Sequence, residues 1–106
     1  MNAEFDKIIA EAHAAGVAAG SEPKPWFPCG FAWVNVKPGT SRFARYAKTL
    51  GVGRYPDWRP DSYYGGITLW VSDYGQCMEQ KAAYAEAYAE VLRRHGIAVT
   101  SNSRMD

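Results

Sequence analysis

The spacing of apolar and polar residues along the chain predicts three helices that alternate with three strands. In residues 4–19, apolar side chains recur every three or four positions, at Phe5, Ile8, Ile9, Ala12 and Ala15. This spacing is typical of an amphipathic helix, which we expect to end at Gly20. Most of the apolar stripe is alanine, so the helix should pack closely against another element. The same stripe is also a candidate contact for a homodimer.

The first strand is predicted over residues 31–37, where side chains alternate between two faces. One face would carry Phe31, Trp33, Asn35 and Lys37, and the other Ala32, Val34 and Val36. The small apolar face suits a covering helix, and the aromatic-to-polar face suits partial exposure. Shorter apolar runs predict a second strand over residues 67–71 and a third over residues 97–100.

Two further helices lie between these strands. After a Pro-Gly turn, Thr40 or Ser41 is placed to cap a helix that runs to Leu50 and ends at Gly51. The longest helix is expected over residues 76–95, with tyrosines at its edges whose hydroxyls stay in contact with water. Residues 21–30 are a proline-rich connector, residues 51–64 a long aromatic loop, and residues 101–106 a polar tail.

The order α-β-α-β-α-β predicts a two-layer fold of the α+β or α/β class, in which one layer is a small three-stranded sheet and the other is formed by the helices that cover it. The pattern leaves the direction of the strands open. A chain of 106 residues, 47% of them hydrophobic, is sufficient for one core, so a single domain is expected over residues 1–106. The formal net charge of +1 is too small for a generally basic nucleic-acid coat.

The cysteines and the amino-terminal residues predict a cytoplasmic protein. Cys29 and Cys77 are far apart and form no CxxC pair, which is typical of reduced thiols. The first six residues carry acids where a targeting peptide has bases. No apolar run approaches the roughly 18 residues that a membrane helix needs. We therefore expect no membrane association.

One segment is both basic and aromatic. Residues 37–64 contain six basic residues against two acidic ones, a net charge of +4, and five Tyr or Trp residues are interleaved with them. The residues predicted to bind a partner are Arg42, Arg45, Tyr46, Arg54, Tyr55, Trp58, Arg59, Tyr63 and Tyr64.

Three interpretations of this segment stay open. Tyr, Trp and Arg are the residues that dominate protein interfaces, which favours a protein partner. Stacking rings with arginines also suit single-stranded nucleic acid. In the third, purely structural interpretation, the rings complete a second small core and the arginines face water.

The predicted strand-to-helix junction at residues 72–77 is a second candidate site. Sites in α/β sheets gather at the ends of strands, and helix N-termini favour anions. The candidate anion or ligand site comprises Ser72, Asp73, Gly75, Gln76 and Cys77. A nucleophilic Cys77 is one interpretation. The favoured one is structural, with a capping Ser72 or Asp73 and a buried Cys77.

The histidines do not support chemistry at Cys77. His95 would lie about 27 Å from Cys77 along one continuous helix, too far to serve as its base. A metal site would need His13, Cys29, Cys77 and His95 to converge, and the same separation prevents Cys77 and His95 from sharing an ion. The sequence has no P-loop and no dinucleotide fingerprint. We therefore predict no catalytic residue, no metal and no cofactor.

Several short stretches resemble small proteins encoded by phages, prophages and plasmids. The stretches are residues 30–36, 38–41, 70–74 and 103–106, so that the resemblance covers residues 30–106. That group has no established activity, so no catalytic residue is transferred. The resemblance implies a mobile-element protein in the cytoplasm of a bacterial host.

Together these observations predict a small non-enzymatic binding protein. Its partner would be a host or phage protein, and inhibition of a host defence system is the role that the resemblance implies. The alternatives are a single-stranded nucleic-acid-binding protein that uses the same basic-aromatic surface, and an enzyme centred on Cys77.

Overall fold

The computed structural model describes residues 3–21, 30–49, 58–61, 63, 65–71 and 78–105. Helices and strands follow one another as α1 (Ala3–Gly20), β1 (Gly30–Val36), α2 (Arg42–Lys48), β2 (Trp58–Pro60), β3 (Ile67–Trp70), α3 (Met78–Arg94) and β4 (Val99–Met105). None of the helices in these ranges is long and apolar enough to cross a membrane.

The four strands form one sheet in the order β2-β3-β1-β4, and every neighbouring pair is antiparallel. The central strand β1 places Trp33 opposite Trp70 of β3 on one side and opposite Asn102 of β4 on the other. From β1 onward, the chain follows the β-α-β-β-α-β order of two interleaved split β-α-β units, the ferredoxin-like topology. The fold class is therefore α+β.

The prediction of three strands was wrong, because β2 lies inside the predicted aromatic loop. With three residues ending at Pro60, β2 is too short to show an alternating pattern. The polar tail was also wrong, because residues 101–105 continue β4 and pair with β1 as far as Gly30 and Met105. Residues 100–104 of β4 are all polar, which an edge strand of an antiparallel sheet tolerates.

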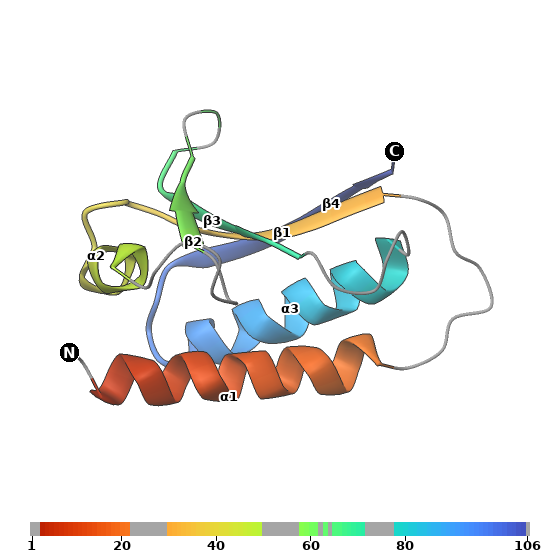
Figure 1. Cartoon of the computed structure of the whole chain (residues 1–106), viewed down its shortest axis with the longest axis horizontal. Coiled ribbons are helices and arrows are strands. Elements are labelled where there is room, and N and C mark those ends of the chain that lie inside the picture. The colour runs from red at the N-terminus through yellow and green to blue at the C-terminus, as the bar shows by residue number, and fades with distance from the viewer. Residues whose placement is uncertain are drawn as a thin grey trace.

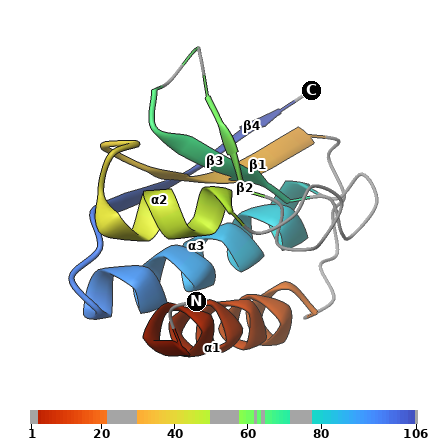
Figure 2. The same cartoon turned by 60° about the vertical axis from the view of Figure 1, so that its left-hand side comes forward.

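The helices stack on one face of the sheet (Figures 1 and 2). The sheet is uppermost in both views, α3 lies beneath it, and α1 lies beneath α3. The helices therefore form two layers of their own, instead of the single covering layer that was predicted. Tyr84 of α3 is fully buried against α1, and Tyr88 is fully buried against Trp58 of β2. This burial corrects the prediction that the tyrosine hydroxyls of this helix stay in contact with water.

The alanine-rich stripe of α1 packs against α3, as the close-packing interpretation predicted. Ala12 is fully buried in the core. At Gly16, a Cβ atom would stand 2.6 Å from the ring of Tyr84, so only glycine permits this approach of the two helices. The contact is tightened by His13, whose Nδ1 lies 2.6 Å from the Tyr84 hydroxyl.

Helix α2 begins after Ser41, one of the two caps that the sequence predicted. The Ser41 hydroxyl accepts a hydrogen bond from the Ala44 amide at 3.3 Å. The helix ends earlier than expected, at Lys48, and Leu50 and Gly51 lie outside the described residues. Phe43 anchors α2, because its ring meets Phe5 of α1 and Trp58 of β2 edge-on.

Candidate ligand-binding face of the sheet

The face of the sheet opposite the helices carries aromatic, polar and basic side chains. Residues paired across the strands share a face, and those directed away from the helices are Phe31, Trp33, Asn35, Arg59, Thr68, Trp70, Thr100, Asn102 and Arg104. We call this the open sheet face, because none of the described helices covers it (Figure 1). The alternation predicted for β1 is confirmed here.

Three aromatic rings cluster on the two central strands. The centroids of Trp33 and Trp70 are 4.8 Å apart, and the ring of Phe31 meets that of Trp70 edge-on at 6.5 Å. Trp70 is 46% exposed and Phe31 40%, whereas Trp33 is only 5% exposed. The partial exposure predicted for this face therefore holds for Phe31 but fails for Trp33 and for Asn35, which is buried as well. Of the three rings, Trp70 and Phe31 are therefore accessible to a ligand.

A chain of hydrogen bonds fixes the polar part of the face. The Asn35 side-chain amide donates to the Gly65 carbonyl at 2.9 Å and to the Thr68 hydroxyl at 3.0 Å. The Thr68 hydroxyl in turn donates to the Asp61 carboxylate at 2.6 Å. The other Asp61 oxygen accepts the amide of Tyr63 at 2.9 Å. These bonds hold the β2-β3 hairpin in place and occupy both oxygens of Asp61.

Glycine at position 66 lets this hairpin lie against the end of β1. Gly66 has φ +66°, and a Cβ there would come within 2.1 Å of the Val36 carbonyl oxygen. Any other residue would push the hairpin away and separate Asn35 from its acceptors. The hairpin therefore belongs to the construction of the open sheet face.

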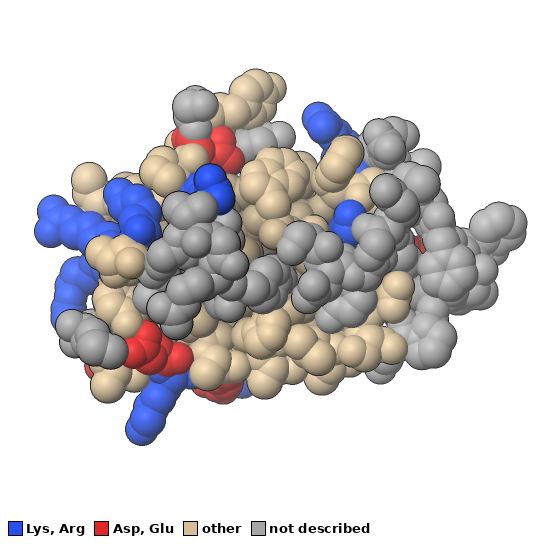
Figure 3. Space-filling view, in the orientation of Figure 1, with Lys and Arg blue, Asp and Glu red and all other residues tan. Residues whose placement is uncertain are grey.

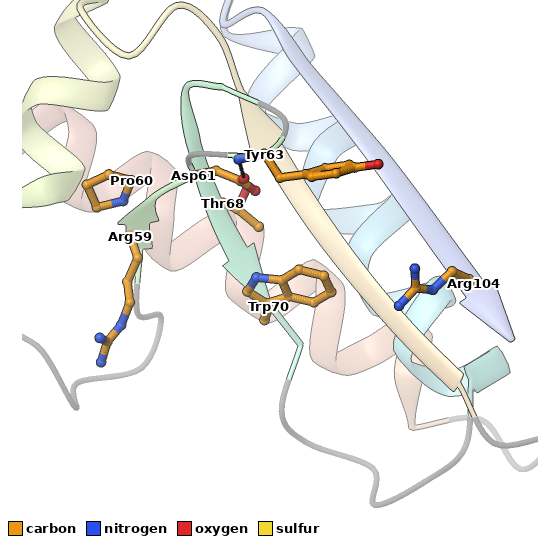
Figure 4. A pocket seen from close by; sticks show the side chains of 7 residues that line it. All are labelled: Arg59, Pro60, Asp61, Tyr63, Thr68, Trp70 and Arg104. Atoms are coloured by element: carbon orange, nitrogen blue, oxygen red, sulfur yellow. Dashed lines mark hydrogen bonds between the residues drawn. The ribbon is translucent and has the colours of Figure 1, made fainter. Parts of the chain in front are cut away.

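A hollow of about 490 Å³ opens over the face between the hairpin and β4. Figure 4 shows Trp70 at its centre, with Arg104 directed toward it from β4 and Tyr63 extending across from the hairpin. Its lining residues are Arg59, Pro60, Asp61, Tyr63, Thr68, Trp70 and Arg104. The volume lies within the range of about 300–1,000 Å³ typical of ligand sites. We call it the central hollow.

The structure divides the predicted basic-aromatic surface. Arg59 and Tyr63 line the central hollow. Arg42 and Arg45 are exposed on α2, which lies on the helix side of the sheet (Figure 2), and basic side chains gather at that end of the molecule (Figure 3). Tyr46 is half-buried on α2 and its hydroxyl donates to Asp6 of α1.

Trp58 does not belong to a contact surface. It is only 2% exposed, and its ring packs against Phe43 at 5.8 Å and Tyr88 at 6.0 Å between centroids. Its assignment as a partner-binding residue was wrong, because position 58 of β2 faces the helices. Arg54, Tyr55 and Tyr64 lie outside the described residues.

Sequence reasoning missed Phe31, Trp70 and Arg104 as site residues. The signal was present for Phe31, because the alternation of β1 already placed an aromatic face away from the apolar one. For Trp70 and Arg104 no local pattern was sufficient, because only the pairing of β3 and β4 with β1 brings them beside Phe31.

The second predicted site, Ser72, Asp73, Gly75, Gln76 and Cys77, lies outside the described residues. The two histidines instead link α1 with α3 and with the residue that follows α3. His95 Nε2 lies 3.0 Å from a carboxylate oxygen of Glu11, and His13 contacts Tyr84. In the described part of the chain, no three His, Cys, Asp or Glu residues come together in a group that could hold a metal ion.

Comparison of the chain with protein families, with characterised proteins and with solved structures found no match. Function is therefore inferred from the geometry of the open sheet face, and the mobile-element context stays a prediction.

Proposed function

We propose that the protein binds single-stranded nucleic acid on the open sheet face, with bases stacked on Trp70 and Phe31. The observation that carries the proposal is the pair of exposed rings on the two central strands, with arginines on both outer strands. Four-stranded sheets that bind RNA use aromatic rings on the sheet surface in this way.

Stacking supplies the sequence-independent part of the affinity. Each base stacked on an aromatic side chain contributes about 1–3 kcal/mol, and any base has a flat face to offer. The ring of Phe31 packs edge-on against Trp70 at an angle of 88°, and this mutual packing restricts both side chains before a ligand arrives. Little side-chain entropy is then lost on binding.

The flanking residues supply charge and hydrogen bonds. Arg59 on β2 and Arg104 on β4 stand on opposite sides of Trp70, where they can contact phosphates of a strand that crosses the sheet. Asp61 is the one acid that the described residues contribute to the central hollow, and its oxygens accept bonds from Thr68 and Tyr63. Its repulsion of phosphate is thereby reduced.

A protein partner is the second candidate for the same face. Exposed Trp and Arg side chains are typical of interface hot spots, and here Trp70 and Arg104 adjoin one hollow. Inhibition of a host defence system would be such an interaction, and it rests on the resemblance to mobile-element proteins alone. Nucleic acid is favoured because the two exposed rings lie side by side on adjacent strands and are flanked by arginines on both sides.

Fluorescence anisotropy with labelled single strands tests the proposal. We expect oligonucleotides of about 10 nucleotides to bind at ~50 mM salt and to weaken at ~200 mM salt, because phosphate contacts release counterions. Trp70→Ala should weaken binding by about 5- to 150-fold, the loss of one stacked base. Val17→Ala, at an exposed apolar position of α1, is the control and should change nothing.

Two results would contradict nucleic-acid binding. One is the absence of binding at ~50 mM salt, and the other is binding that Trp70→Ala and Val17→Ala affect equally. Absence of binding to any strand, combined with a defined complex with a purified protein that Trp70→Ala disrupts, would favour the second candidate.

A further inference from the structure

A second hollow, of about 450 Å³, adjoins the central one at the end of the sheet where β1 begins and β3 and β4 end. It is lined by Phe31, Trp70, Val71, Lys81 and Arg104. Trp70 and Arg104 line both hollows, so a ligand on the open sheet face reaches from one into the other. We call this second space the end hollow.

Lys81 is the unusual member of this lining. Its side chain is on α3, and the residue is only 7% exposed. The ammonium donates to the Gly30 carbonyl at 3.3 Å and lies 5.9 Å from the centroid of the Phe31 ring. Burial of a charge is costly unless an opposite charge compensates it. Both contacts that the described residues make with the ammonium are with neutral groups.

A second cation stands beside the same ring. The guanidinium carbon of Arg104 lies 5.8 Å from the Phe31 centroid. Within the described part of the chain, no carboxylate forms an ion pair with Lys81 or with Arg104. The end hollow therefore gathers two positive charges around one aromatic ring, and lacks a described negative charge.

The helix adds to this imbalance. Lys81 lies in the first turn of α3, where the positive end of the helix dipole disfavours a cation and favours an anion. A lysine at this position loses free energy from burial and from the dipole together. An anion in the end hollow would offset both costs, and Arg104 would offer it a planar set of donors.

We infer that the end hollow binds a phosphate monoester, which in the proposed function is the terminal phosphate of the bound strand. This inference rests on the proposed function for the source of the phosphate. A monoester carries close to two negative charges at neutral pH, which matches the two cations. The depth of Lys81 favours a chain end, because an internal phosphodiester would have to enter and leave the hollow with its chain on both sides.

The rings explain how the terminal nucleotide would be held. Its phosphate lies between Lys81 and Arg104, and its base stacks on the exposed face of Trp70 or Phe31, which line the same hollow. The next nucleotides then extend over the central hollow toward Arg59. The end hollow thus sets where a strand begins on the sheet.

Oligonucleotides of one sequence with a 5′-phosphate, a 3′-phosphate or two hydroxyl ends test the inference by competition. We expect one phosphorylated form to bind about tenfold or more tightly than the hydroxyl form. The preference should grow between pH 5 and pH 7, because the monoester loses its second proton near pH 6. Which end is preferred gives the direction of the strand.

Two lysine variants make the test specific. Lys81→Met keeps the length of the side chain and removes the charge, and it should abolish the preference while hydroxyl strands still bind. Lys48→Met is the matched control, because Lys48 also donates to a backbone carbonyl but is exposed on α2. It should keep the preference. If Lys81→Met does not fold, Arg104→Met, at an exposed position, should reduce the preference.

The outcomes separate this inference from the proposed function. Equal binding of phosphorylated and hydroxyl strands overturns the phosphate site and leaves nucleic-acid binding standing. If no strand binds, the proposed function fails, and titration with inorganic phosphate and a nucleoside monophosphate then decides the end hollow by NMR. If phosphate shifts the Gly30 and Lys81 signals, and the Gly30 shift is lost in Lys81→Met, a phosphate site is supported. Spectra that phosphate leaves unchanged overturn it.

Discussion

Trp33 and Trp70 stand opposite each other on β1 and β3, with ring centroids 4.8 Å apart, and only Trp70 is substantially exposed. The buried ring of Trp33 packs beside that of Trp70 on the same face of the sheet. The protein therefore separates the residue that forms the surface from the residue that holds it in place. We therefore expect mutation of exposed residues to change ligand binding, and mutation of buried residues to change stability.

The two tryptophans should respond differently to a ligand. A base stacked on Trp70 should quench its fluorescence, so Trp70→Phe should remove most of the quenching that single strands produce. Trp33→Phe should keep most of it, because Trp33 is buried beside Trp70. Steady-state fluorescence titration of both variants checks this. Equal loss of quenching in both would place the ligand elsewhere.

Arginine substitutions should distinguish the open sheet face from the basic end at α2. Arg104→Ala should weaken strand binding and lower the slope of log affinity against log salt by about one, the loss of one phosphate contact. Arg45→Ala removes an arginine that is also exposed, on the helix side, and should leave the slope unchanged. The reverse result would restore α2 as the contact surface.

Trp58→Ala should damage the fold. The ring of Trp58 fills the space between Phe43 and Tyr88, so its removal leaves a cavity in the core. We expect the free energy of unfolding to fall by about 3–5 kcal/mol. Urea unfolding followed by circular dichroism measures the loss. A stable Trp58→Ala protein with weakened ligand binding would instead support the surface role that the sequence predicted.

Gly16→Ala should destabilise the protein, although alanine is the better helix former. In an exposed helix the change would stabilise by up to about 1 kcal/mol. Here the added methyl would stand 2.6 Å from the ring of Tyr84, and such overpacking costs about 1–3 kcal/mol. Thermal unfolding, with the exposed Ala18→Gly as the comparison, tests the sign. A higher melting temperature for Gly16→Ala would mean that α1 and α3 are less closely packed.

Removal of residues 101–106 should abolish cooperative unfolding. If these residues were a polar tail, their loss would be nearly neutral. In the structure they supply most of β4, which covers one whole edge of β1. A truncated chain that keeps a sharp thermal transition and the same melting temperature would show that β4 contributes little.

The sequence was sufficient to predict the helices and strands whose apolar residues recur at a regular spacing. The helical spacing around Ile8 and Ala12 and the alternation around Val34 predicted α1 and β1 to within a residue or two. The cap of α2 was predicted at Thr40 or Ser41, and Ser41 takes the role, because capping depends on local hydrogen bonds alone. Local chemistry was the common factor in these predictions.

What the sequence could not supply was the pairing of distant segments. A three-residue β2 and a serine-rich β4 carry no period, and both become strands only because β3 and β1 offer them partners. The same limit explains the candidate site. Reasoning along the chain grouped Trp58 with Arg59, which point to opposite faces of the sheet, and did not bring Phe31 together with Arg104, which pair across it.

That pairing of Phe31 with Arg104 also has a kinetic consequence. Phe31 lies on β1 and Arg104 on β4, the two paired strands that are farthest apart along the chain. Contacts of this kind form slowly, because a long loop must close before they can be made. The β2-β3 hairpin is local and can form early, but it provides only part of the lining. Partly folded chains therefore lack part of the candidate site. Under the proposed function, a nucleic-acid strand that binds there would selectively stabilise molecules in which β1 and β4 have paired.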